Sequence, residues 1–140
     1  MANSILIVED SPTQAMLLKA LLERDQYEVH MAADGEKGLA AARQIHPGLI
    51  ISDIMMPVMN GYEMTYAVKH DPAIHNIPVM LLSTLSNPED IVQGINSGAD
   101  YYLLKPYDDD YILASVKAIF EAPARQKGRE EIREMEIVVD

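Results

Sequence analysis

The fold of this chain is decided by one stretch, Ile50-Ile51-Ser52-Asp53-Ile54-Met55-Met56-Pro57-Val58-Met59-Asn60-Gly61. Its apolar first half is typical of a strand that is buried on both faces. Pro57 and Asn60-Gly61 predict a loop that leads into a helix. Asp53 therefore falls at the carboxyl end of a central strand, where open α/β sheets bind their ligands. A carboxylate this close to a core is costly unless another group pairs with it.

The remaining chain repeats the same pattern of a strand followed by a helix. We expect strands over residues 4–8, 27–31, 49–52, 78–82 and 101–104, and helices over about 11–24, 34–46, 60–69, 87–98 and 108–121. Parallel strands need such crossovers, so the pattern predicts a flavodoxin-like, doubly wound five-stranded parallel sheet with helices on both faces. Only 27–31 has the alternation of a half-exposed edge strand, which fits the order 2-1-3-4-5. The other edge strand, 101–104, is more apolar than expected, and a partner surface over it would account for that.

Three of the helix starts carry residues that favour capping. Ser11 precedes Pro12 and is followed three positions on by Gln14, and Asn60 is followed by Glu63 in the same way. Asn87 precedes Pro88 and repeats the combination of a capping residue and proline. These residues predict where the helices begin.

Composition and charge restrict the classes of function. The chain has 140 residues and no cysteine, which suits one domain and excludes disulfides, thiolate metal sites and thiol catalysis. No apolar run approaches the roughly 20 residues that span a bilayer, and the N-terminus lacks the basic region of a secretory signal. We therefore expect a cytoplasmic protein with no membrane contact. The net charge of −11 disfavours direct binding to nucleic acid and suits a metal ion or a basic partner.

The domain organisation changes near residue 122. We expect residues 1–122 to form the single domain. Residues 123–140 are charged and helix-prone with few apolar side chains, so they are either a linker to a domain absent from this chain or a frayed tail.

Polar residues follow four of the predicted strands at the same edge of the sheet: Glu9-Asp10, Asp53, Ser83-Thr84 and Lys105-Pro106. Three carboxylates so close would repel one another unless a cation joined them, and oxygen ligands favour Mg²⁺ or a similar hard divalent ion. Lys105 adds a positive charge and Ser83 a hydroxyl. Together these groups predict a cradle for a phosphoryl group, with Asp53 as the nucleophile that accepts it.

On these motifs the chain resembles the receiver domain of two-component response regulators over about residues 4–121. The resemblance implies that Asp53 is the phosphoacceptor and that Mg²⁺ or Mn²⁺ binds the side chains of Asp10 and Asp53. It also implies ligation by the backbone carbonyl of Met55 and, through water, by Glu9.

The resemblance further assigns roles around the acceptor. Lys105 would pair with the phosphoryl oxygens, the peptide before Pro106 would be cis, and Ser83 and Tyr102 would be the switch positions. Thr84 stands where the family usually has a smaller residue, so it would crowd the phosphoryl group.

The resemblance also implies a function and partners. The chain would be a phosphorylation-switched signalling module rather than an enzyme, with a histidine kinase or a phosphotransfer protein as donor. The fourth helix, fifth strand and fifth helix would form the face that binds a downstream protein or an attached output domain, and a homodimer through this face is possible. Met55 and Leu85 occupy positions that tune loss of the phosphoryl group in the family. Neither side chain can orient a water molecule, which predicts a long-lived phospho-form.

Three other functions remain open. An aspartyl-phosphate phosphohydrolase would need an acid two residues after Asp53, where this chain has Met55. A flavin-binding module would need a hydroxyl-rich phosphate loop after the first strand, where this chain has Glu9-Asp10. A receiver used only as a protein-binding scaffold is disfavoured by the complete set of acids, hydroxyl and lysine.

Overall fold

The computed structural model describes residues 3–85 and 87–122. Its strands are β1 (Ser4–Val8), β2 (Glu28–Ala32), β3 (Leu49–Asp53), β4 (Val79–Ser83) and β5 (Tyr101–Leu104). Its helices are α1 (Pro12–Arg24), α2 (Gly35–Ile45), α3 (Gly61–Lys69), α4 (Pro88–Asn96) and α5 (Asp109–Glu121). All neighbouring strands pair in parallel and their order is β2-β1-β3-β4-β5, which confirms the predicted fold. The proposed linker or tail at 123–140 lies outside the described residues.

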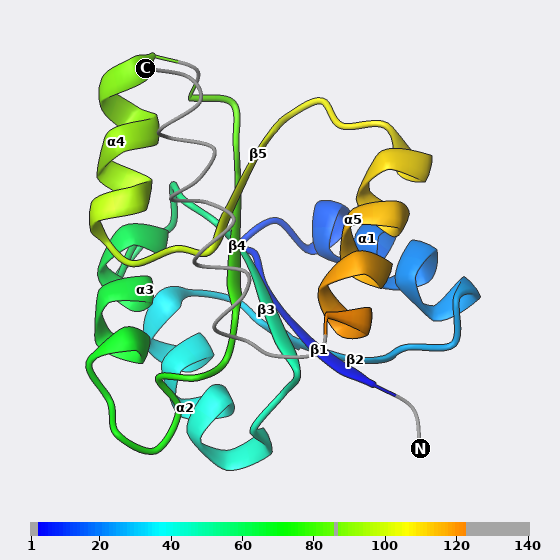
Figure 1. The fold of residues 1–140 in the computed structure, drawn as a ribbon, viewed down its shortest axis with the longest axis horizontal. Coiled ribbons are helices and arrows are strands. Elements are labelled where there is room, and N and C mark those ends of the chain that lie inside the picture. Colours follow the sequence, from blue (N-terminus) through cyan, green and yellow to red (C-terminus); the bar gives the residue numbers. More distant parts are fainter. Residues whose placement is uncertain (1–2, 86, 123–140) are drawn as a thin grey trace.

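The helices form two layers around the sheet (Figure 1). α1 and α5 lie on one side, and α2, α3 and α4 lie on the other. A hydrophobic core lies on each side of the sheet, and β1 contributes to both because side chains alternate along a strand. Leu6 and Val8 pack towards α2 and α3, whereas Ile5 and Ile7 pack towards α1 and α5. This burial on both faces explains why the central strands are apolar at successive positions.

The two edge strands differ in burial. β2 is partly or fully exposed along its whole length, which confirms it as the half-exposed edge. In β5, Tyr101, Tyr102 and Leu103 are half-buried and Leu104 is 41% exposed. A partner over this apolar edge stays a prediction.

The helix starts agree only in part with the predicted caps. The Asn60 side chain accepts from the N–H of Glu63, and the Glu63 carboxylate accepts from the N–H of Asn60, so this capping box is complete. Asn87 makes no side-chain capping hydrogen bond, so that prediction is wrong in its mechanism although the helix begins there. The other half of that prediction is confirmed, because Pro88 stands at the first position of α4, where its fixed φ suits a helix.

The strand register brings the predicted polar residues to one edge. Val8 lies beside Ser52, Asp53 beside Leu82, and Ser83 beside Leu104, so the residues that follow these strands meet at the carboxyl ends. Within the described ranges, no helix is long and apolar enough to cross a membrane.

Candidate functional site

Three carboxylates converge at the carboxyl ends of β1 and β3. Oxygen atoms of Glu9, Asp10 and Asp53 all lie within 4.8 Å of one another. Glu9 is buried, Asp53 is half-buried and Asp10 is exposed, so the cluster opens to solvent on one side. Burial raises the pKa of Glu9, and the nearby charge of Asp53 raises it further. A set of oxygen donors with this mutual repulsion fits a hard divalent cation such as Mg²⁺.

Asp53 is held in place by its own loop. Its Oδ1 accepts the N–H of Ile54 at 2.9 Å, and the N–H of Gly61 donates to the carbonyl of Ile54 at 2.9 Å. A Cβ on Gly61 would lie 2.4 Å from the carbonyl oxygen of Asp53. Only glycine fits this approach, so the start of α3 presses directly on the backbone of Asp53.

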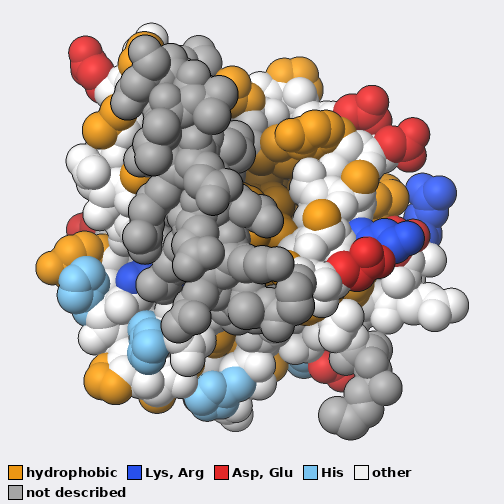
Figure 2. All heavy atoms as spheres, in the orientation of Figure 1, with side chains coloured by type: hydrophobic (Ala, Val, Ile, Leu, Met, Phe, Trp, Pro, Cys, Tyr) orange, Lys and Arg blue, Asp and Glu red, His pale blue; other side chains and the backbone are white. Residues whose placement is uncertain are grey.

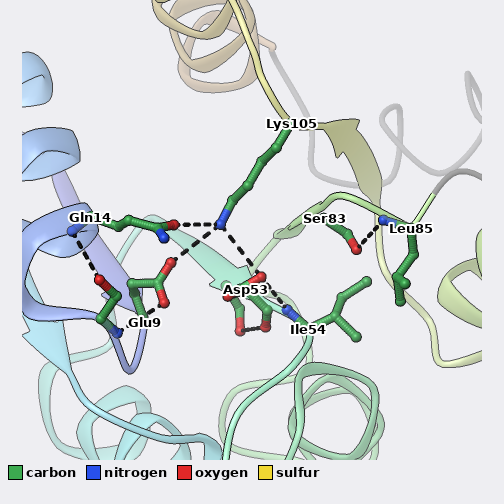
Figure 3. Close-up of polar contacts among 9 residues, drawn as sticks. Glu9, Gln14, Asp53, Ile54, Ser83, Leu85 and Lys105 are labelled. Atoms are coloured by element: carbon green, nitrogen blue, oxygen red, sulfur yellow. Dashed lines mark hydrogen bonds and ion pairs between the residues drawn. The ribbon is translucent and has the colours of Figure 1, made fainter.

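The Lys105 ammonium lies between three acceptors (Figure 3). Its Nζ is 2.9 Å from Oε1 of Gln14, 3.3 Å from Oε1 of Glu9 and 3.6 Å from Oδ1 of Asp53. The peptide bond between Lys105 and Pro106 is cis. The Lys105 ammonium thus lies beside the Glu9 and Asp53 carboxylates of the cluster.

Sequence reasoning missed the contact of Gln14 with Lys105, because Gln14 had a local use as a capping residue. The Ser11 hydroxyl does accept the N–H of Gln14, at 3.3 Å. The return bond expected from the Gln14 side chain is absent, since the N–H of Ser11 donates to the Glu9 carboxylate at 3.1 Å. The Gln14 side chain is thereby available to Lys105.

The two predicted switch residues both bind one residue of the loop after β4. The N–H of Leu85 donates to the Ser83 hydroxyl oxygen at 2.9 Å, and the Tyr102 hydroxyl donates to the Leu85 carbonyl at 2.9 Å. Ser83 is buried and its hydroxyl points to Leu85 on the far side of Asp53 from Gln14 (Figure 3). Backbone groups of Leu85 thus connect the two side chains, a link for which the sequence carries no signal.

The loop between β3 and α3 has an unusual conformation. Val58 is 74% exposed and has a φ of 70°, which a β-branched residue rarely adopts. The N–H of Met59 donates to the carbonyl of Pro57 at 2.7 Å across it, and the carbonyl of Met59 accepts the N–H of Gly35. The bond from Gly35 ties the loop to the start of α2.

Two other predicted site residues, Thr84 and Met55, are exposed to solvent. Thr84 follows Ser83 and is exposed. Met55 is 67% exposed, so its side chain projects away from the core. In all, the structure brings Glu9, Asp10, Asp53 and Lys105 together, whereas the hydroxyls of Ser83 and Tyr102 are engaged by the loop after β4.

Comparison with known proteins gives consistent matches. The family model described as the response regulator receiver domain matches residues 5–117. The DNA-binding dual master transcriptional regulator RpaA of Synechocystis is 40% identical over 121 residues, which cover 86% of this chain and 50% of RpaA. Protein PilH of Pseudomonas aeruginosa is 39% identical over 115 residues, which cover 82% of this chain and 95% of PilH. The crystal structure of a signal receiver domain of a histidine kinase from Syntrophus aciditrophicus has a TM-score of 0.82 at 40% identity, covering 87% of this chain and 92% of that one.

Proposed function

Because the chain belongs to the response regulator receiver domain family, we propose that it carries a signal by accepting a phosphoryl group on Asp53. Receiver domains are signalling domains rather than enzymes in the usual sense, and phosphorylation is typical of the family. The observation that carries the proposal is the convergence of three carboxylates and the Lys105 ammonium at one edge of the sheet. A protein-binding scaffold would not need this costly grouping of charges.

The transfer step uses the Asp53 carboxylate as nucleophile. One oxygen of Asp53 forms a bond to phosphorus while the bond from phosphorus to the donor histidine nitrogen breaks. The bonding electrons leave with the imidazole, which takes a proton from solvent. The hydrogen bond from Ile54 orients the carboxylate, and the Lys105 ammonium stabilises negative charge on the phosphoryl oxygens.

A divalent cation completes the site. Receiver domains typically bind Mg²⁺ at an acidic pocket, and the oxygen donors of this chain fit it. Asp10 and Asp53 would hold the ion with their side chains, Met55 with its backbone carbonyl, and Glu9 through a water molecule. When bound, the ion supplies positive charge that offsets the repulsion between the carboxylates and the incoming phosphoryl group.

Phosphorylation would then shift the loop after β4. It replaces the single negative charge of the Asp53 carboxylate with a phosphoryl group of about −1.5 to −2 charges, and it brings new acceptor oxygens. The Ser83 hydroxyl turns towards these oxygens and gives up the N–H of Leu85, and the Tyr102 bond to Leu85 changes in response. Tyr102, which packs against the core in this structure, would move into the space that Ser83 vacates. We expect phosphorylation to shift an equilibrium that already exists rather than to create a new state.

The partner face is formed by α4, β5 and α5. Val92, Leu104 and Tyr111 are 53%, 41% and 60% exposed on these three elements, which favours an apolar contact with a downstream protein, an output domain or a second copy. Acidic side chains gather over the first turn of α5, at the upper right of the molecule (Figure 2). They favour a partner with basic groups beside the apolar contact.

The phosphoryl donor and the output domain are proposed from what is typical of response regulators. Response regulators act with histidine kinases and output domains, so a histidine kinase or a phosphotransfer protein is the proposed donor. RpaA is described as DNA-binding, but the chain spans half its length. We therefore propose an output domain as a covalently attached domain or a separate partner of this chain.

The phospho-form should be long-lived. Met55 is 67% exposed at the rim and Leu85 lies in the loop after β4, and neither side chain carries a group that could orient a water molecule. The exposed Thr84 would further narrow access to the phosphoryl group. Labelled protein that lost its phosphoryl group within seconds in Mg²⁺ buffer would contradict this expectation.

The proposal is tested by incubation with Mg²⁺ and acetyl phosphate, followed by intact mass spectrometry. Wild-type protein should gain the mass of one phosphoryl group, and Asp53→Asn should gain none. Asp110→Asn, which removes an exposed carboxylate in the first turn of α5, is the matched control and should label like the wild type. Equal labelling of Asp53→Asn and the wild type would refute Asp53 as the acceptor.

A further inference from the structure

Lys105 must reach the phosphoryl group with its charge intact, yet it lies among competing acceptors. An ammonium group has three N–H donors and no acceptor. Here the donors face Gln14 at 2.9 Å, Glu9 at 3.3 Å and Asp53 at 3.6 Å. The shortest contact is with the neutral side chain rather than with either carboxylate.

We propose that Gln14 is a positioning residue that holds the Lys105 ammonium beside Asp53 for phosphoryl transfer. This role rests on the proposed function, because it concerns the same acceptor. Gln14 comes from the first turn of α1 and Lys105 follows β5, so the contact joins segments 91 residues apart. Since lysine cannot accept a hydrogen bond, the amide oxygen of Gln14 must face it, whichever way the amide is assigned.

The start of α1 fixes the root of the Gln14 side chain. Its N–H is bound by the Ser11 hydroxyl, and Pro12 sets the first helical position. Glu9 satisfies the N–H of Ser11, so the Gln14 amide has no capping task. A side chain that starts from a fixed point loses less conformational freedom when it binds Lys105.

The chemistry of the acceptor matters as much as its position. An amide oxygen orients the ammonium without cancelling its charge, whereas a carboxylate at the same place would form a further ion pair. A cavity of about 20 Å³ is also lined by Gln14, Glu9, Asp53 and Lys105. The contact with Gln14 therefore holds the Lys105 ammonium in position and leaves its positive charge to stabilise an incoming phosphoryl group.

Three variants test this role. Gln14→Met keeps the length of the side chain and removes the acceptor, and Gln14→Glu keeps an acceptor but adds a charge. Gln44→Met makes the same chemical change on an exposed residue of α2 and serves as the control. The rate of labelling by acetyl phosphate with Mg²⁺ is measured for each. In parallel, the carbon-13 shift of Lys105 Cε, assigned by its loss in Lys105→Met, reports the environment of the ammonium.

Gln14→Met should slow labelling about five- to tenfold and move the Lys105 signal, whereas Gln44→Met should do neither. Gln14→Glu should also label slowly at low salt and recover as salt screens the added charge. Gln14→Met at the wild-type rate, or with an unmoved Lys105 signal, would overturn the proposal, as would Gln14→Glu at the wild-type rate in low salt. Wild-type protein that takes no label would instead refute the proposed function itself, and the role of Gln14 in transfer with it.

Discussion

Breaking the buried ion pair between Lys69 and Asp100 should destabilise the protein more than breaking any surface ion pair among the residues that the structure describes. Nζ of Lys69 lies 2.6 Å from Oδ2 of Asp100 and 2.7 Å from the carbonyl of Ile77, and the two side chains are 6% and 5% exposed. Oδ2 of Asp100 also accepts the N–H of Val79 at 2.8 Å. The pair therefore ties the last turn of α3 to the starts of β4 and β5, at the end of the sheet opposite Asp53.

Lys69→Met keeps most of the buried stem but leaves the Asp100 carboxylate without its ion pair. Breaking a buried pair costs about 3–5 kcal/mol, and we expect the lower end, about 3 kcal/mol, because Asp100 keeps the N–H of Val79. With a urea slope of about 1.5 kcal/mol per molar, the unfolding midpoint should fall by about 2 M. Equilibrium urea unfolding followed by circular dichroism measures it.

A matched control and a rescue sharpen the test. Lys117→Met removes an exposed lysine whose Nζ is 3.9 Å from Glu121, and should change the free energy of unfolding by less than about 0.5 kcal/mol. Asp100→Asn in the Lys69→Met background should recover part of the loss, because the amide oxygen still accepts the N–H of Val79 without a buried charge. If Lys69→Met lowers the midpoint no more than Lys117→Met, the reasoning about this buried pair is refuted.

Three further predictions follow from local geometry. A Cβ on Gly94 would lie 2.7 Å from Cδ2 of Tyr102, so Gly94→Ala should destabilise the protein by about 1–2 kcal/mol in urea unfolding, but stabilise it in a Tyr102→Ala background; the same sign in both backgrounds would contradict this. Val58→Asn should stabilise by about 1 kcal/mol, because asparagine tolerates the φ of 70° better than valine, and an unchanged or lower melting temperature would argue against strain there. The hydrogen bond from Arg43 lowers the pKa of Asp71 below its ordinary value of 3.8, so this contact stabilises the fold above that pH and is lost as pH falls through the lowered pKa. Asp71→Asn should therefore melt below the wild type at pH 7 with a gap that narrows towards pH 3, and a constant gap would exclude this linkage.

The parts of the site that lie along strands could be predicted from the sequence, and the parts built by contacts between distant segments could not. The apolar runs before Glu9, Asp53 and Ser83 place those residues at one edge, because parallel strands share their direction. The acceptor for the Lys105 ammonium is a side chain from α1, and no local pattern connects Gln14 with a residue 91 positions away. The capping pattern instead predicted that the Gln14 side chain would accept the N–H of Ser11. In the structure the Glu9 carboxylate accepts that N–H.

The backbone geometry around the site could not be predicted from the sequence either. The two hydrogen bonds of Leu85 use its backbone N–H and carbonyl. Nearly every residue has both groups, and proline lacks only the N–H, so the identity of residue 85 does not predict these bonds. The positive φ of Val58 is opposite to what its side chain favours, so it reflects the tertiary contacts of the loop. The ion pair of Lys69 with Asp100 likewise joins residues that are separate in the sequence.

The central claim is that Asp53 takes the phosphoryl group in a site that needs a divalent cation. Its most direct test is to label the protein with acetyl phosphate, reduce it with borohydride, which converts an aspartyl phosphate into homoserine, and locate the homoserine by tandem mass spectrometry. We predict homoserine at position 53 in the presence of Mg²⁺ and none when EDTA removes the ion. Homoserine at a different carboxylate, or the same yield at position 53 with EDTA, would contradict the account.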